Sequence, residues 1–445
     1  MFFLLLLSVL QICFIPGFIL YLFLNRKRDE TTVLLAPVFS FGLSLLINYI
    51  IVQALVALHL YNRTALFIII ISELLILAGL FHFRKTDVKE FRFGKQFKRL
   101  IEEGSLLINF KGSLYDKLKS ILFVVAVLLL TGMMVQMILN FGKIFHGWDA
   151  VFSWNRWAID ISNNKMPSST YHYPQLIPAN WSVSYVLCGY PLQFIPKAMM
   201  PLFLIFQIYA FIVLAIKRNS FIFIYAALFL FLGFNRLNWT EGFVDVPVAF
   251  YSILVYLCLI LINKEDEEKY KTGYVVLSLL FACASAVTKQ AGIYVVLTFP
   301  ILLLLFTKDI ILWSTKRVIK TALLFLLLVL IIIVPYYIYA EMAIKAGRAA
   351  SEVPYVTKEI YDGASWTERL MNAGKVFSGI FGSRALFLIA IVPFLLSFTD
   401  RTYRVLNFLV VIPFLVIWAL FFSYDLRNAA IVIPYFCLAI GAGLN

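Results

Sequence analysis

The sequence has 445 residues, of which 62% are hydrophobic and only 14% are charged, and its net charge is +14. Soluble domains carry about 25% charged residues, and no soluble core of this length could bury so much apolar surface. The composition therefore excludes a soluble protein. Apolar runs of roughly 20 residues predict an all-α polytopic membrane protein.

The apolar runs predict about thirteen transmembrane helices. They lie at 2–24, 33–60, 64–82, 120–140, 196–216, 219–234, 247–263, 273–288, 290–306, 318–339, 384–398, 405–422 and 427–444. No basic region precedes the first run, and its apolar stretch is long, so we expect a span rather than a cleaved signal. Because no repeat or low-complexity linker interrupts the chain, we expect one membrane domain over 1–445.

The distribution of basic residues predicts an N-terminus outside and a C-terminus in the cytoplasm. Of the 38 Lys and Arg residues, 24 then fall in loops on the inside. The positive charge is explained by this topology and by attraction to anionic lipid, so a nucleic-acid partner is not expected. The basic loop at 84–119 is either an interfacial helix on anionic headgroups or a solvated connector.

The loop at 141–195, expected outside, contains an amphipathic pattern. Trp154 lies on its apolar side and Arg156 on the opposite side, which predicts a helix along the membrane surface. Asp149 comes just before the first turn, where its simplest role would be an N-cap worth about 1 kcal/mol. Tyr173 follows, in a turn before a short apolar helix. These aromatic side chains either stack against sugars or lipid chains or anchor the surface helices.

Further charged residues lie at the mouths of apolar runs on the same side. They are Glu241 and Asp245 in NWTEGFVDVP, Lys289 in VTKQAG, and Arg427 in SYDLRN. Carboxylates are costly near hydrocarbon and usually mark a functional site when they gather there. The alternative for Lys289 is that it snorkels to the interface.

Four segments resemble the GT-C membrane glycosyltransferases, in the order that this superfamily shows. GWDAVFSWNRWA…YHYPQLIPANW resembles its first outer loop, NWTEGFVDVPVAFY its G-Y-x-D-x-P-x-A motif, AVTKQAG its T-K-x-E-G step, and YDLRNAAIVIPY its late R-Y-x-x-P segment. The chain departs from the pattern where Gln290-Ala291 replaces the acidic position of that step and where Ala150, not a second carboxylate, follows Asp149.

The resemblance implies a GT-C-like fold and transfer of a sugar from a polyprenyl-phosphate donor, with Asp149 as the catalytic or site-organising carboxylate. Independently of the family, a positioned carboxylate can take the proton of an attacking hydroxyl, and cations can stabilise a phosphate leaving group. Glu241, Asp245, Lys289, Gln290, Arg427, Arg156, Tyr173 and Trp154 are the candidates for binding donor or acceptor. A divalent metal held by Asp149, His146 and His172 stays open, because no ligand spacing demands it.

The expected setting is a bacterial plasma membrane with an extracytoplasmic site, a lipid-linked sugar donor, membrane lipids, and a glycan, lipid or protein acceptor. A transporter or lipid-sugar flippase is the alternative, and a saccharide polymerase or ligase shares the chemistry. Transporters place charges near the bilayer midplane in repeated halves. Here only Glu73 lies at depth, and its role stays open. The long loop at 340–383 is expected outside as a lid or binding segment.

Overall fold

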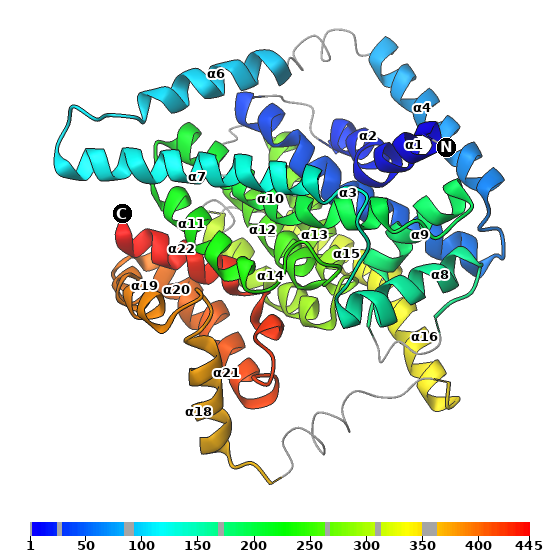
Figure 1. Ribbon diagram of the computed structural model, residues 1–445. Helices are drawn as coiled ribbons and strands as arrows, with labels where there is room; N and C mark the ends of the chain where they lie inside the picture. The colour runs from blue at the N-terminus through cyan, green and yellow to red at the C-terminus, as the bar shows by residue number, and fades with distance from the viewer. Residues whose placement is uncertain are drawn as a thin grey trace.

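A computed structural model of the chain describes residues 2–24, 29–83, 93–167, 173–262, 268–307, 313–348 and 363–445. Within these ranges every regular element is a helix (Figure 1). In chain order they are α1 (Phe2–Cys13), α2 (Ile15–Leu24), α3 (Glu30–Ala57), α4 (Arg63–Phe83), α6 (Phe93–Leu106), α7 (Leu114–Leu139), η1 (Ala150–Asn155), α8 (Arg156–Ser162), α9 (Leu176–Cys188), α10 (Phe194–Arg218), α11 (Ile222–Asn235), α12 (Asp245–Ile262), α13 (Glu268–Ala286), η2 (Gln290–Gly292), α14 (Ile293–Phe306), α15 (Thr315–Leu328), η4 (Val329–Ile333), α16 (Val334–Lys345), α18 (Trp366–Phe377), α19 (Arg384–Leu396), η6 (Ser397–Thr399), α20 (Arg401–Leu406), η7 (Asn407–Val411), α21 (Ile412–Phe421), η8 (Leu426–Ala429) and α22 (Ile433–Leu444).

Eight helical segments in the described part of the chain are long and apolar enough to cross a membrane. They are Phe2–Leu24, Glu30–Ala57, Arg63–His82, Leu114–Leu139, Phe194–Arg218, Asp245–Ile262, Thr315–Lys345 and Arg401–Phe421. Each coincides with a predicted span. The prediction of an all-α, multi-pass membrane protein is therefore confirmed at this level.

The other five predicted spans also form apolar helices, but these are short. α11, α14 with η2, the apolar part of α13, α19 with η6, and α22 have 10–17 residues. A rise of 1.5 Å per residue leaves such helices shorter than a typical hydrocarbon core of about 30 Å. The total of thirteen spans therefore stays a prediction.

α12 lies at the centre of the molecule. All of its side chains from Asp245 to Ile262 are buried, and it packs against α13, α10 and α14. A helix that is apolar on every side belongs inside a bundle. At the periphery, α4, α7 and α15 leave large apolar side chains exposed, as expected for surfaces that face lipid. Glu73 of α4 is buried, and its carboxyl contacts Gln11 of α1.

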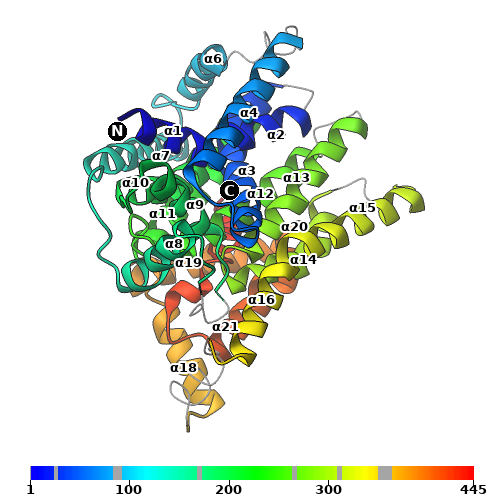
Figure 2. The ribbon, with the colours of Figure 1, turned by 90° about the vertical axis from the view of Figure 1, so that its right-hand side faces the viewer.

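The surface elements follow the sequence patterns closely. The amphipathic pattern after Asp149 folds as η1 and α8, with Trp154 buried and Arg156 exposed. In the basic loop, residues 93–106 form α6, while 84–92 lie outside the described residues. α6 lies at the top and α18 at the bottom in both views (Figures 1 and 2). The loop predicted at 340–383 contributes the end of α16 and all of α18, and 349–362 fall outside the described residues.

The turn between α13 and α14 depends on Gly292. A Cβ atom at this position would lie 1.9 Å from the backbone oxygen of Ser285. Since the backbone fixes the position of the Cβ atom and the oxygen belongs to backbone, neither can move aside without separating the two helices.

We therefore expect Gly292→Ala to destabilise the protein by about 1–3 kcal/mol, the usual cost of overpacking. Thermal unfolding of the purified protein in detergent measures the effect. Gly79→Ala in α4 is the matched control, because a Cβ there meets no atom within 4 Å. Equal melting temperatures for the two variants would contradict this account of the turn.

Candidate functional site

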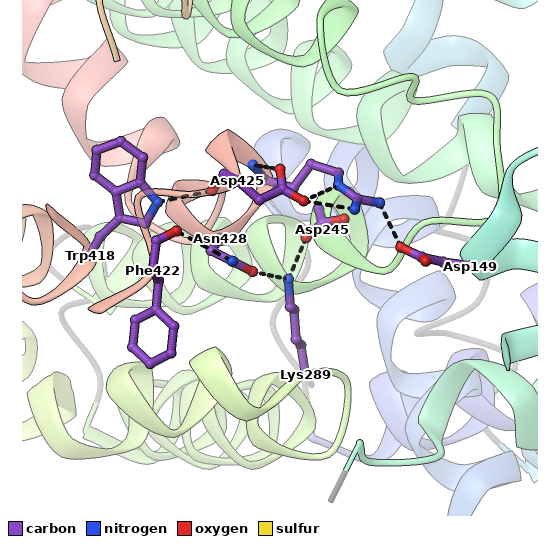
Figure 3. Close-up of polar contacts among 8 residues, drawn as sticks. Asp149, Asp245, Lys289, Trp418, Phe422, Asp425 and Asn428 are labelled. Carbon is purple, nitrogen blue, oxygen red and sulfur yellow. Dashed lines mark hydrogen bonds and ion pairs between the residues drawn. The ribbon is translucent and has the colours of Figure 1, made fainter. Parts of the chain in front are cut away.

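Four chain segments that lie far apart in the sequence meet at one end of the helical bundle. They are the segment between α7 and η1, the connection from α11 to α12, the turn between α13 and η2, and the segment from α21 to η8 (Figure 3). Each segment supplies charged side chains to a common polar network. The predicted gathering of Asp149, Asp245, Lys289 and Arg427 is thus present in the structure.

Arg427 is the hub of this network. Its Nη1 atom donates to Oδ2 of Asp149 at 2.8 Å, and its Nε atom donates to Oδ2 of Asp425 at 2.7 Å. Asp425 is fixed in turn, because its Oδ1 atom accepts from the backbone N–H of Arg427 at 2.9 Å. One planar guanidinium thereby bridges two carboxylates, a geometry that lysine cannot reproduce.

The titration behaviour reflects this bridging. Burial alone would raise the pKa of Asp425, but the hydrogen bonds and charge of Arg427 outweigh it and hold that pKa below its usual range. Burial would lower the pKa of Arg427, yet the hydrogen bond to Asp425 and the charges of Asp245, Asp425 and Asp149 raise it. The cation and Asp425 therefore stay charged at neutral pH.

Asp149 directly precedes η1, but its side chain makes no capping bond to that helix. Arg427 is the only described residue that pairs with this carboxylate, and the Asp149 side chain remains 40% exposed. The N-cap alternative therefore does not describe the side chain. A carboxylate that is oriented by one cation and open to solvent can accept a proton from a bound molecule.

A second ion pair lies next to Arg427 in the same network. The Nζ atom of Lys289 donates to Oδ1 of Asp245 at 2.6 Å and to Oδ1 of Asn428 at 2.9 Å. Lys289 is only 9% exposed and Asp245 only 3%, so this lysine is not simply snorkelling to the interface. The pair joins the first residue of the central helix α12 to the residue after Arg427.

The network borders a cavity of about 490 Å³. Its lining residues are Trp148, Asp149, Arg236, Leu237, Asn238, Phe243, Val376, Gly379, Asp425, Leu426 and Arg427. The Arg427 guanidinium lies 4.6 Å from the centre of the Phe243 ring. The cavity thus combines carboxylates, two arginines and aromatic faces, which is a chemistry suited to a polar ligand with an anionic group.

Glu241, predicted to bind donor or acceptor, is held by contacts within the protein. Its carboxylate pairs with Nζ of Lys197 at 2.5 Å and accepts from the backbone N–H groups of His146 at 3.1 Å and Gly147 at 3.4 Å. It does not line the cavity. Glu241 therefore fixes the segment that leads into Trp148 and Asp149. We call its contacts with Lys197, His146 and Gly147 the Glu241 clamp.

Gly242 allows this connection to pack closely. A Cβ atom there would lie 2.7 Å from the Trp181 ring and 2.8 Å from the Cβ atom of Ala150. Any larger residue would push the α11–α12 connection away from η1. The glycine of the NWTEGFVDVP segment is thus required by packing next to the site.

Four other predicted site residues do not line the cavity. Trp154 packs edge-on against Tyr173 with ring centroids 5.3 Å apart, in an aromatic cluster beside α9. Arg156 is exposed on α8, and Gln290 is half-buried at the start of η2. In these positions the four side chains pack near the site and do not face this cavity.

The described residues contain no group of three or more His, Cys, Asp or Glu side chains placed to hold a metal ion. The Asp149 carboxylate is paired with the guanidinium of Arg427. His146 contributes a backbone N–H to Glu241, and His172 lies outside the described residues.

The sequence patterns did not point to Lys197 or Asn428. Lys197 lies inside the predicted span 196–216, where an ionisable residue usually marks a functional site. Asn428 carries no such signal, because it is not ionisable and lies at the very start of the predicted span 427–444. Its role follows only from its contact with Lys289.

Comparisons of the chain with protein-family models, with curated proteins and with solved structures found no match.

The Glu241 clamp predicts a pH-dependent stability. Burial would raise the pKa of Glu241, but the bonds from Lys197, His146 and Gly147 lower it below its usual range. The stabilisation is then fully present above the unfolded-state pKa of about 4.3 and is lost as pH falls through the lower folded-state pKa. We expect Glu241→Gln to cost about 1.5–3 kcal/mol at neutral pH and progressively less below about pH 4.

Melting temperatures of wild type and variant across this pH range measure the effect. Glu341→Gln serves as the control, because its ion pair with Lys345 is exposed and contributes little. A constant difference between Glu241→Gln and wild type at every pH would contradict the clamp.

Proposed function

We propose that this protein is a membrane glycosyltransferase that moves a sugar from a polyprenyl-phosphate donor to an acceptor hydroxyl at the cavity beside Asp149. The observation that carries the proposal is the Asp149–Arg427–Asp425 bridge at the rim of that cavity. The GT-C-like arrangement and an extracytoplasmic location of the cavity belong to the same proposal.

Asp149 would act as the base. As the acceptor oxygen forms its bond to the anomeric carbon, its proton passes to the Asp149 carboxylate. A positioned carboxylate contributes about 10²- to 10⁴-fold in this role. Arg427 would orient the carboxylate, and the partial exposure of Asp149 leaves room for the acceptor.

A cavity arginine other than Arg427, namely Arg236, would stabilise the leaving group. The bond between the anomeric carbon and the phosphate oxygen breaks, and its electron pair stays on the lipid phosphate. Arg236 is the more available cation, since its side chain is exposed and, among the described residues, donates only to the carbonyl oxygen of Gly382 at 3.5 Å. One displacement of this kind inverts the anomeric centre.

Aromatic side chains give the cavity a surface for a sugar ring. Trp148 is 70% exposed, and its ring lies 4.1 Å from that of Phe152. Phe243 also lines this cavity. An amphipathic sugar face can stack on such rings while its hydroxyls contact the charged groups.

The first test is the Asp149→Asn variant in lipid with a polyprenyl-phosphate sugar. We expect the transfer rate to fall by about 10²-fold or more while donor binding is retained. Asp160→Asn is the matched control, because Asp160 lies on α8 and does not line the cavity. Full transfer activity in Asp149→Asn would remove this residue from catalysis.

A second test separates the charge of Arg427 from its shape. We expect Arg427→Gln to lower kcat by about 10²- to 10³-fold, the usual cost of losing a positioned electrostatic donor. Arg427→Lys should recover only part of that loss, because an ammonium cannot bridge Asp149 and Asp425 with the same fork. Arg384→Gln, an exposed arginine outside the cavity, is the control.

A lipid-sugar flippase is the rival outcome. It would move the lipid-linked sugar across vesicle membranes without forming a glycosidic product. Transport without transfer in wild type, unaffected by Asp149→Asn, would replace the present proposal with that one.

A further inference from the structure

A second cavity lies far from the polar network. It has a volume of about 480 Å³ and is bounded by α6, α7, α10 and the start of α3. Its lining is almost entirely apolar, and includes Phe97 and Ile101 of α6, Phe123 and Leu130 of α7, and Ile212 of α10. α6 borders this groove and α18 borders the Asp149 cavity, and the two helices lie at opposite ends of the molecule in both views (Figures 1 and 2).

The groove is held open by fixed contacts at its edges. Lys217 of α10 pairs with Glu103 of α6 at 2.7 Å and with Glu30 of α3 at 2.8 Å. Beyond the end of α6, the backbone N–H of Asn109 donates to Oγ of Ser120 on α7 at 2.7 Å. These bonds attach α6 to its neighbours along one flank and at one end, so the space between α6 and α7 is preformed.

An apolar space of this kind is not filled by water. α7 is a membrane span with many exposed apolar side chains, so the groove opens where hydrocarbon chains are the surrounding solvent. Because lipid tails are as apolar as the groove lining, burial of a chain gives little selectivity. Any selection among lipids must therefore come from charges beside the groove.

Those charges are mainly positive. Ser105 marks the edge of the apolar stripe of α6, and Lys98 comes next around the helix. Glu102, Lys95 and Arg99 follow, so three exposed cations face one exposed carboxylate on this side. An amphipathic helix with a basic polar face attracts anionic lipid headgroups.

We propose that the α6–α7 groove binds one acyl chain of an anionic phospholipid, whose headgroup lies against Lys95 and Lys98. The occupant is selected by the exposed lysines and positioned by the preformed apolar space. This site is independent of the glycosyl-transfer proposal.

The experiment is native mass spectrometry of the full-length protein, delipidated in detergent and then supplied with phosphatidylglycerol or phosphatidylcholine of the same acyl chains. We expect wild type to retain one phosphatidylglycerol in preference to phosphatidylcholine. Ile101→Trp should fill the groove and abolish this retention. Leu128→Trp, on an exposed face of α7 outside the groove, should leave it unchanged.

A paired charge variant tests the headgroup. Lys95→Gln with Lys98→Gln should weaken phosphatidylglycerol binding roughly 30-fold, which corresponds to about 1 kcal/mol for each basic residue near an anionic lipid. Lys316→Gln with Lys320→Gln, which removes two exposed lysines from α15, is the matched control and should have no effect.

Melting temperatures confirm that each variant is folded. Retention of phosphatidylglycerol by folded Ile101→Trp would overturn the groove as the binding site. Equal retention of the two lipids, equal loss in the two lysine pairs, or no retained lipid in wild type would overturn the proposal as well.

Discussion

The guanidinium of Arg427 is the interaction on which the site depends. It joins Asp149, which follows α7 and is 278 positions away in the sequence, to Asp425, which precedes η8. Without this cation two carboxylates would lie beside each other at the rim of an apolar bundle, where like charges repel and desolvation is costly. The arginine therefore stabilises the gathering of acidic groups and also fixes their directions.

The ion pair of Lys289 and Asp245 explains why Arg427 lies where it does. Asn428 is held by Lys289, and Lys289 is neutralised by Asp245 at the start of the buried helix α12. Burial of Asp245 and Lys289 is tolerable only because they are paired with each other. The fully buried helix α12 thus helps to position the segment that presents Arg427 to Asp149.

Sequence patterns predicted the helical membrane class, the eight long spans and the convergence of Asp149, Asp245, Lys289 and Arg427, because these follow from hydropathy and from the cost of charge near lipid.

Sequence patterns could not predict which side chains pair with each other. Glu241 looked like a ligand-binding carboxylate, but its bond to Lys197 places it behind the site. Trp154 and Tyr173 looked like a stacking surface, but they pack against each other. Spacing along one element predicts which face a side chain occupies, whereas pairing between elements depends on tertiary packing.

The balance of charges in the site bears on how a phosphate would enter it. Three carboxylates, Asp149, Asp245 and Asp425, share two engaged cations, Arg427 and Lys289. An incoming phosphate would have to compete with these carboxylates for either cation. Arg236 lines the same cavity and forms no ion pair with any described residue, so it can meet a phosphate first. In the proposed reaction Arg427 would then keep Asp149 oriented as the base while Arg236 holds the leaving group, and the two roles would not draw on the same guanidinium.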